Sequence, residues 1–338
     1  MRQIDGGAGG GQLLRWAVAL SALRGEAIEI ESIRGARDPP GLRPQHLAAV
    51  RAAAAFTDAE VSGLEEGSET LEFDPGPVTG GNTAVDVGTA GSIPLVFDTV
   101  LPLALQARAP IQLTVTGGTD VKWSPPIDYL RYVKAPVLAD FGLQMSLDVE
   151  RRGFYPSGGG RATLTLQPSD LRPIERTDRG PLAGFEVYSV ATADLGDAEV
   201  AERQAETAAL ELDPLAPAPV ETSVEYVEAA SAGSSLVLVT RYEQSRAGFT
   251  TLGERGKPSE VVARETISSF EAFDAASGAI DTHLVDQLLP FLAVAGGHVT
   301  TPARTDHLET AVELVRDFGY TVTVVETEDL VDVTAPGR

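Results

Sequence analysis

Apolar positions along the chain change from a helical to a strand spacing and back at regular intervals. After a glycine run at 9–11, apolar residues recur at helical spacing from Leu13 to Leu23. An alternating stretch over 27–33 predicts a strand, and a loop over 34–43 follows it. A second helix is expected over 45–56, with another strand after it. Glycine loop, helix, strand, loop, helix and strand therefore form one unit.

The unit occurs again in two later parts of the chain. In the second copy, Gly-Thr-Ala-Gly at 88–91 precedes a helix expected over 92–107 and a strand over 111–116. A second helix is expected from Asp128, followed by a strand over 144–149. In the last copy, the expected elements are a helix from Asp286, a short strand and loop over 297–302, a helix opening at His307, and a strand over 321–326. Each copy starts its second helix with a similar triplet, at 45–47, 128–130 and 306–308.

The spacing of these triplets predicts where an extra segment lies. Residues 46 and 129 are 83 positions apart, whereas residues 129 and 307 are 178 apart, so the third copy carries roughly 95 additional residues. The composition changes after the stretch 168–174. We therefore expect one large domain over 1–179 plus 274–338, with a small domain inserted over 180–273. Elements expected in the insertion are strands over 184–191, 220–229 and 235–242, and helices over 198–212 and 259–275.

Composition fits an α/β protein, with 43% hydrophobic and only 6% aromatic residues. There is no cysteine, which excludes disulfides and thiolate metal sites. No apolar run has membrane-spanning length, and the first residues lack the apolar stretch of a signal peptide. We therefore expect a cytoplasmic protein without a membrane partner, of undetermined oligomeric state.

Net charge is the most unusual bulk property. The chain has 49 acidic and 26 basic residues, for a formal charge of −23, and only three of the basic residues are lysines. An acidic surface poor in lysine is typical of a halophilic protein that stays soluble in concentrated salt. Such a charge opposes nucleic-acid binding at low salt. In high salt that repulsion is screened, so a nucleic-acid partner stays possible where arginines cluster.

His307 is the first candidate for chemistry. Asp306 and Glu309 predict a capped helix start, which places His307 in the first turn. The positive end of a helix disfavours the imidazolium form, and its free amides attract phosphate. A neutral imidazole beside an anion site suits a nucleophile toward phosphorus. Taken alone, this helix fits a surface histidine after a cap better.

Three arginines, Arg34, Arg37 and Arg43, share a loop stiffened by prolines, and Arg15 lies one turn into the first helix. Two interpretations are possible: the loop is simply solvated, or its arginines bind a terminal phosphate through several forked contacts. The glycines at 9–11 lack the Lys and Ser/Thr of a P-loop, because Gln12 follows them. The four histidines lack an HxH or HxxxH spacing for zinc, and no GxSxG elbow of a serine hydrolase occurs.

Several stretches together resemble the RNA 3′-terminal phosphate cyclase family over essentially the whole chain. They are Gly9-Gly-Gly-Gln-Leu-Leu-Arg15, Ser32-Ile-Arg-Gly-Ala-Arg37, Pro40-Gly-Leu-Arg-Pro-Gln-His46, Gly117-Gly-Thr-Asp120, Arg152-Gly-Phe-Tyr-Pro-Ser-Gly-Gly-Gly160, Gly253-Glu-Arg-Gly-Lys-Pro258 and Asp286-Gln-Leu-Leu-Pro290. The resemblance implies an α/β (α+β) fold of three repeated βαβαββ-type units forming one large domain, with the smaller α/β domain inserted before the third. That agrees with the spacing of the triplets.

The resemblance also implies a ligase that converts an RNA 3′-phosphate to a 2′,3′-cyclic phosphate, with ATP and Mg²⁺ or Mn²⁺. Its partners would be RNA 3′ ends and ATP, and a covalent AMP–histidine would form on His307. Residues implied in ATP binding are His283, Leu284, Val285, Asp286, Gln287, Asp98 and Pro126, with His283 and Pro126 on the two faces of adenine. Residues implied in binding the RNA 3′-phosphate are Arg15, Arg34, Arg37 and Gln45.

Two positions depart from the family pattern. Ala8 stands where the family usually has a glutamate, and Asp98 stands where a glutamine is expected. The metal ligands are therefore unknown, and Asp98 is a candidate for the missing carboxylate. Two alternatives stay open: a non-catalytic cyclase-like protein of RNA processing, and, more distantly, an enolpyruvyl-transferase-like enzyme built from similar repeats.

Overall fold

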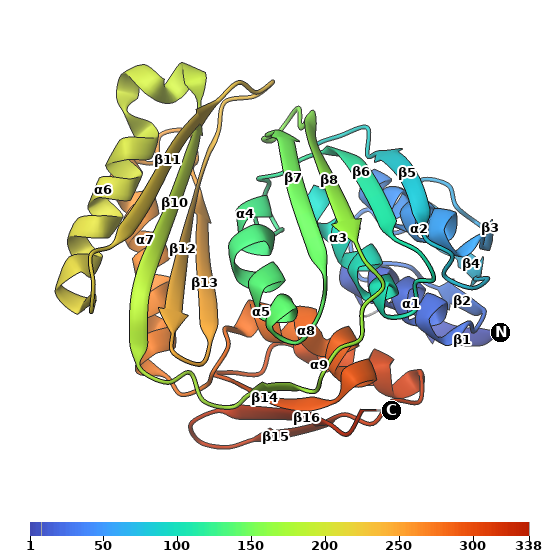
Figure 1. Cartoon of the computed structure of the whole chain (residues 1–338). Helices are drawn as coiled ribbons and strands as arrows, with labels where there is room; N and C mark the ends of the chain where they lie inside the picture. Colours follow the sequence, from blue (N-terminus) through green and yellow to red (C-terminus); the bar gives the residue numbers. More distant parts are fainter. Residues whose placement is uncertain (8, 338) are drawn as a thin grey trace.

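The structure, a computed structural model, describes residues 1–7 and 9–337. In this part of the chain, helices and strands form four four-stranded mixed sheets with helices packed against them (Figure 1). The α/β class predicted from the sequence is thus confirmed. No helix of the described residues is long and apolar enough to cross a membrane.

The first sheet has the strand order β1-β2-β4-β3. The first pair is parallel and the other two pairs are antiparallel. Its strands are β1 (Arg2–Asp5), β2 (Ile28–Glu31), β3 (Glu60–Ser62) and β4 (Leu71–Asp74). The helices of this unit are α1 (Gly11–Arg24) and α2 (Pro44–Thr57). In β2 the alternation has its expected cause, because Ile28 and Ile30 are buried and Glu29 and Glu31 are not.

The second sheet repeats this order as β5-β6-β8-β7, again with one parallel and two antiparallel pairs. Its strands are β5 (Gly81–Asp86), β6 (Ile111–Gly117), β7 (Met145–Arg151) and β8 (Gly160–Leu166). Its helices are α3 (Ile93–Val100), a 3-10 turn (Leu101–Leu105), α4 (Ile127–Tyr129), a π turn (Leu130–Lys134) and α5 (Ala135–Asp140). The single helix expected over 92–107 is therefore an α-helix followed by a 3-10 turn that begins just before Pro102.

The third sheet has the same order and directions once more, β9-β14-β16-β15. Its strands are β9 (Ile174–Arg176), β14 (Gly297–Thr301), β15 (Thr323–Glu326) and β16 (Val331–Ala335), and its helices are α8 (Thr282–Ala295) and α9 (Asp306–Asp317). The sequence patterns missed β9 and β16. Because β9 precedes the insertion and pairs with β14 after it, the inserted segment interrupts this sheet's unit.

The inserted segment forms the fourth sheet, in the order β11-β10-β12-β13. Its elements are β10 (Leu182–Thr192), α6 (Val200–Leu212), β11 (Glu221–Val227), β12 (Ser234–Tyr242), β13 (Arg246–Leu252) and α7 (Ser259–Ala275). Phe185, Phe249 and Phe270 belong to a core between this sheet and its helices. On the other face, Tyr188 stacks on Tyr132 with ring centroids 3.8 Å apart. The domain boundaries at 179/180 and 273/274 stay a prediction.

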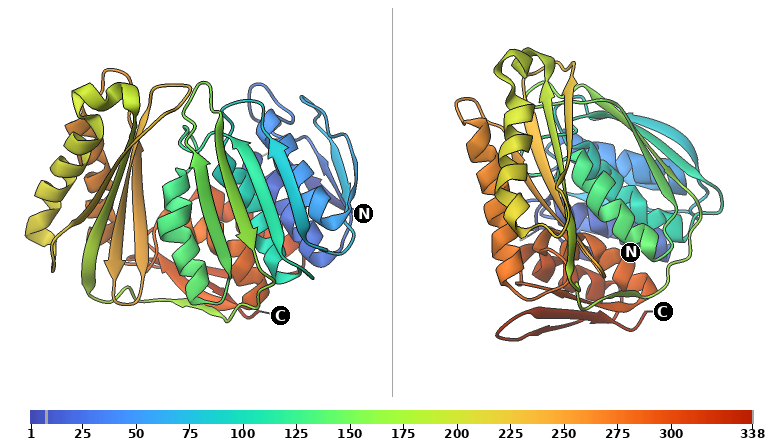
Figure 2. Two further views of the ribbon diagram at one scale, coloured as in Figure 1. Left: turned by 45° about the horizontal axis from the view of Figure 1, so that its top comes forward. Right: turned by 60° about the vertical axis from the view of Figure 1, so that its left-hand side comes forward.

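Helix α1 is central to the large part of the molecule. Nearly all its residues from Leu13 to Leu23 are buried, because it packs against α2, α3 and α9 together. Figure 2 shows α1 and its neighbouring helices packed together among the sheets of the three units, with the inserted sheet standing to one side. This packing brings the N-terminal turns of α1 and α9 toward the same region.

Candidate active site

His307 lies in the first turn of α9, as the sequence predicted, but the cap is a different residue. Thr305, not Asp306, is the N-cap, and its hydroxyl accepts the Leu308 amide at 3.0 Å. The same hydroxyl donates to Asp286 Oδ1 at 3.0 Å. A threonine hydroxyl can do both at once, so this cap joins the His307 helix to α8.

The surroundings of His307 favour its neutral form. The side chain is exposed, yet partial burial lowers its pKa, and the charges of His283, Arg15 and Arg37 lower it further, against Asp306. These neighbours come from α8, α1 and the arginine loop. Since Coulomb interactions weaken with distance, the fold has brought four predicted residues close together. The imidazole is therefore available as a nucleophile at neutral pH.

Arg15 is a buried guanidinium with unused donors. It is only 7% exposed, and its Nε has no hydrogen-bond partner among the described residues. Burial lowers its pKa to about 10, while Asp98 opposes that shift. A buried cation with a free donor is costly unless an anion completes its coordination. Arg15 therefore marks a receptor for an anionic ligand at the start of α1.

The arginine loop is shaped by its own backbone. Arg34 Nη1 donates to the carbonyls of Pro39 and Gly41, at 3.0 and 3.1 Å, which curls the loop around this side chain. Burial lowers the pKa of Arg34, and the charges of Arg43 and Arg37 lower it further. Like charges held this close repel unless an anion binds between them. Arg37 itself is exposed.

His46 belongs to this site, although we did not include it among the predicted site residues. It is 6% exposed, and its Nδ1 accepts the Arg43 amide at 3.1 Å. Burial, followed by the charges of Arg15, Arg34 and Arg43, lowers its pKa to about 3. The ring is therefore neutral, and its proton is assigned to Nε2 because Nδ1 is an acceptor. The signal was present in the sequence, since His46 and His307 hold the same place in their units.

Gly11 is required by His46. A Cβ on Gly11 would lie 2.3 Å from His46 Nε2 and 3.0 Å from Arg15 Nη1. The absence of a side chain at Gly11 therefore lets the neutral His46 ring and the Arg15 guanidinium lie against the first turn of α1. Gln45, the neighbouring predicted phosphate ligand, accepts the Ser92 amide through its Oε1 at 3.0 Å.

The predicted nucleotide segment forms the first turns of α8. His283 is exposed, and Leu284 and Val285 are fully buried. Gln287 Nε2 donates to the His283 carbonyl at 3.1 Å. Burial raises the pKa of Asp286 to about 7, against the hydrogen bond from Thr305. The segment thus presents the His283 ring outward from an anchored turn.

Asp281, which the sequence patterns did not single out, anchors that turn. Its carboxylate accepts the amides of His283 and Leu284 at 3.0 and 2.9 Å and the Tyr129 hydroxyl at 2.9 Å. It also accepts the Gly248 amide at 3.2 Å, from β13 of the insertion. Pro126 is buried at the N-cap of α4, and its carbonyl accepts the Tyr129 amide at 3.0 Å. Pro126 and His283 are therefore linked through Tyr129 and Asp281.

Asp98 is engaged by a lysine. Lys134 Nζ lies 2.7 Å from Asp98 Oδ1, and both side chains are buried. Ala8, the other departure, lies outside the described residues. The described residues contain no group of three His, Asp or Glu side chains that could hold a metal ion. Within the described part of the chain, the expected Mg²⁺ or Mn²⁺ therefore has no preformed set of three such ligands, and Lys134 engages Asp98 Oδ1.

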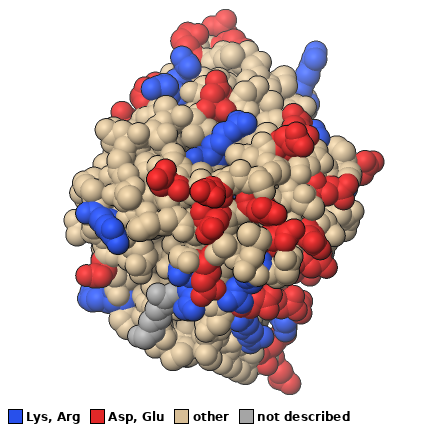
Figure 3. Space-filling view, turned by 90° about the vertical axis from the view of Figure 1, so that its right-hand side faces the viewer, with Lys and Arg blue, Asp and Glu red and all other residues tan. Residues whose placement is uncertain are grey.

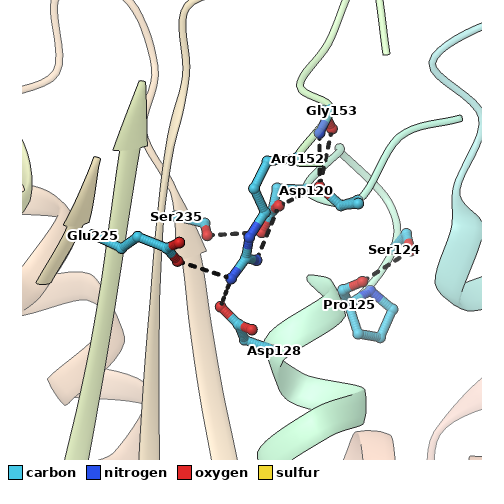
Figure 4. A network of polar contacts seen from close by, with 9 residues as sticks. Asp120, Ser124, Pro125, Asp128, Arg152, Gly153, Glu225 and Ser235 are labelled. Carbon is cyan, nitrogen blue, oxygen red and sulfur yellow. Dashed lines mark hydrogen bonds and ion pairs between the residues drawn. The ribbon is translucent and has the colours of Figure 1, made fainter. Parts of the chain in front are cut away.

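A buried ionic network joins the inserted sheet to the loop before α4 (Figure 4). Arg152 donates to Asp128 Oδ2 at 2.7 Å and to Asp120 Oδ2 at 3.4 Å. Ser235 of β12 donates to Asp120 Oδ1 at 2.8 Å. Removing one partner from such a buried network leaves the other charges uncompensated. The Arg-Gly-Phe-Tyr-Pro element thus begins with an arginine that fixes the position of the 117–126 loop.

Neutral histidines beside Arg15, Arg34 and Arg37, on a repeated α/β scaffold, suit phosphate-bearing ligands. The family model for RNA 3′-terminal phosphate cyclase matches residues 6–324. An RNA 3′-terminal phosphate cyclase of Halobacterium salinarum is 47% identical over 340 residues, covering 97% of this chain and 98% of that protein. Those of Archaeoglobus fulgidus and Pyrobaculum aerophilum are 42% and 41% identical, covering 94% of this chain and 95% and 92% of their own. The chain belongs to the RNA 3′-terminal phosphate cyclase family.

Proposed function

We propose that this protein is an ATP-dependent enzyme that converts an RNA 3′-phosphate into a 2′,3′-cyclic phosphate through an AMP–histidine on His307. The observation that carries the proposal is the neutral, exposed His307 beside Arg15, Arg37 and His283. The names of the relatives support the reaction, and the arrangement of the side chains supports the residue that performs its first step.

In the first step, the lone pair of the neutral imidazole attacks the α-phosphorus of ATP. A nitrogen–phosphorus bond forms, the bond from that phosphorus to its bridging oxygen breaks, and pyrophosphate leaves. The depressed pKa of His307 keeps the lone pair free, and the neighbouring guanidinium groups offset negative charge on the phosphates. His283, exposed on the next helix, is the ring expected to lie against adenine.

In the second step, an oxygen of the RNA 3′-phosphate attacks the phosphorus of AMP and breaks its bond to His307. The product is RNA-(3′)pp(5′)A, and the imidazole is regenerated. The neighbouring 2′-hydroxyl then attacks the 3′-phosphorus, loses its proton and expels AMP, which closes the ring. Arg15, with its free buried donor, and the Arg34 loop are the groups that would hold the 3′-phosphate.

The proposal is tested by incubating the protein with α-labelled ATP and a divalent metal in concentrated KCl. We expect covalent label on the wild type and at least about a thousandfold less on His307→Ala, because the nucleophile is removed. His298→Ala is the matched control, since His298 of β14 pairs with Asp332 of β16 at 2.7 Å and is not among the groups that shift the pKa of His307. Label on His307→Ala equal to wild type would contradict the assignment.

The non-catalytic alternative predicts a different result in the same experiment. If the wild type takes no label at any salt concentration but still binds RNA 3′-phosphate ends, the protein acts by binding alone. Two sequence features favour this outcome, the alanine at position 8 and the aspartate at position 98.

A further inference from the structure

Two aromatic side chains are left uncovered by the fold. Among the exposed large hydrophobic residues that the structure describes, Trp123 and Tyr155 are the only aromatic ones, at 93% and 64% exposure. Leaving an indole in water forgoes the large favourable burial of its surface. The Trp123 backbone is also left-handed, with φ 62°, which is uncommon for a bulky residue. A strained segment presents this ring to solvent.

The position of Trp123 is fixed by contacts that lead to the candidate phosphate site. The next residue, Ser124, has its Oγ 2.5 Å from Ser92 Oγ. The Ser92 amide donates to Gln45 Oε1 at 3.0 Å, and Gln45 is a predicted ligand of the RNA 3′-phosphate. On the other side, Lys122 forms an ion pair with Glu254 of the insertion at 3.3 Å. Two hydrogen bonds, between Ser124 and Ser92 and between Ser92 and Gln45, therefore connect the segment that carries the indole to a predicted phosphate ligand.

The second exposed ring belongs to a loop attached to the first. The Thr119 amide donates to the Gly153 carbonyl at 2.8 Å, and the Gly153 amide donates back to Thr119 Oγ1 at 2.9 Å. Tyr155 lies two residues beyond Gly153. Two loops that are hydrogen-bonded at their bases thus carry Trp123 and Tyr155.

We infer that Trp123 is a stacking platform for a nucleobase of the RNA 3′ end, next to the phosphate held by Gln45 and the arginine loop. Single-stranded RNA ends have unstacked bases whose faces bind aromatic side chains. The net charge of −23 makes this contact valuable, because an acidic protein in high salt gains little from backbone phosphates. Stacking does not depend on net charge. This inference rests on the proposed function for its substrate.

The test uses the fluorescence of the two tryptophans. Trp16 is buried at 4% exposure and reports the folded state, whereas Trp123 reports its own surroundings. We expect a single-stranded oligoribonucleotide with a 3′-phosphate to quench the full-length wild type, and to leave Trp123→Phe, which retains only Trp16, unquenched. ATP alone should not quench the wild type. Quenching by ATP and not by RNA would assign Trp123 to the other substrate and overturn the inference.

Binding of the same RNA, labelled with a dye at its 5′ end, gives the second readout. Trp123→Ala should weaken it by about fivefold to 150-fold, the equivalent of roughly 1–3 kcal/mol for one stacked base at 1.4 kcal/mol per tenfold. Trp123→Phe should recover most of the affinity. Leu210→Ala, at a side chain 77% exposed on α6, is the matched control and should bind like wild type. Unchanged affinity of Trp123→Ala would overturn the inference.

The labelling of His307 by ATP is measured on the same preparations. If ATP labels His307 but Trp123→Ala binds RNA as tightly as wild type, the stacking inference is wrong and the proposed function stands. Absence of labelling removes the proposed catalytic step, while the quenching experiment still decides whether RNA bases stack on Trp123.

Discussion

His46 and His307 occupy the same place in two copies of one unit, yet their surroundings differ in burial and in hydrogen bonding. His46 is buried, and its Nδ1 is engaged by the Arg43 amide. His307 is exposed, and its charged form is disfavoured by neighbours on other elements. The buried ring stabilises the start of α2 beside the arginine loop, whereas the exposed ring has the accessibility that the proposed attack on phosphorus requires. Exposure, more than position in the unit, separates the two roles.

The charge of Arg37 should set part of the reactivity of His307. Arg37 disfavours the imidazolium, so Arg37→Ala should raise the pKa of His307. His307 would then be protonated at higher pH, and the acid limb of the labelling rate should move upward by the same amount. NMR titration of the His307 ring measures the shift directly. Arg304→Ala is the control, because Arg304 pairs with Glu309 at 2.8 Å and is not among the groups that shift His307. An unchanged His307 pKa in Arg37→Ala would refute this.

Single residues were predictable where they belong to a motif and unpredictable where their partners are distant. His307, Arg15 and Arg34 are parts of recognisable stretches. Asp281 is not, because its partners Tyr129 and Gly248 lie far away in the chain. The cap of α9 was assigned to Asp306 because Asp306 has a glutamate three residues later, at Glu309, whereas Thr305 has Leu308 there. The backbone geometry nevertheless makes Thr305 the N-cap.

At the level of elements, the long helices and the strands with regular alternation were predictable, but several other strands, among them β9, β13 and β16, were not. β9 has three residues, and its pairing partner β14 comes after the insertion, so no local pattern distinguishes it. β13 and β16 follow tight turns and were not included among the expected strands. The repeating unit could still be seen, since its glycine loops and helix starts recur at a fixed spacing.

Helix α8 should depend on Asp281 for both stability and nucleotide binding. Asp281→Ala removes the cap of α8 and leaves the Tyr129 hydroxyl and the Gly248 amide without an acceptor. We expect a loss of about 2–4 kcal/mol in unfolding free energy, combining a cap and buried unsatisfied donors. Because His283 and Gln287 lie in the same turns, the KM for ATP should rise as well.

Tyr129→Phe separates these two effects. It removes only the hydroxyl that donates to Asp281, so the loss should be about 0.5–1.5 kcal/mol, with the α8 cap intact and the KM for ATP close to wild type. Urea unfolding and ATP-dependent labelling measure the two quantities. Equal effects of both substitutions would show that the cap bonds of Asp281 contribute nothing.

At the scale of the whole molecule, the spacing of the triplets predicts three units in order and an insertion of roughly 95 residues, but not their arrangement in space. The network of Arg152, Asp120, Asp128 and Ser235 joins elements that are more than a hundred residues apart. Such contacts have no local signature in the sequence. Likewise, charge composition predicts an acidic surface without its distribution. Figure 3 shows acidic side chains across the middle of one face, with basic side chains scattered around them.

The excess of acidic over basic residues should make stability depend on salt. A formal charge of −23 destabilises the compact state through repulsion, and added KCl screens it. The Tm should therefore rise with KCl. Most of the rise should occur below about 1 M, because the Debye length has fallen to about 3 Å at that concentration and further salt screens little more. Replacing exposed acids such as Glu65, Glu69 and Glu313 by Gln should raise the Tm at low salt and flatten this dependence.

Sucrose provides the control for the salt effect, because it strengthens burial without screening charge. If the rise in Tm comes from screening, sucrose should stabilise wild type and the Gln variant equally, whereas KCl should stabilise wild type more. A KCl effect of the same size in both would instead point to exclusion of salt from the surface. The same measurements fix the salt range for the RNA titrations. In that range long-range attraction to phosphates is weak. The RNA affinity that persists must therefore come from close contacts, namely those of the arginines with the 3′-phosphate and the proposed stacking on Trp123.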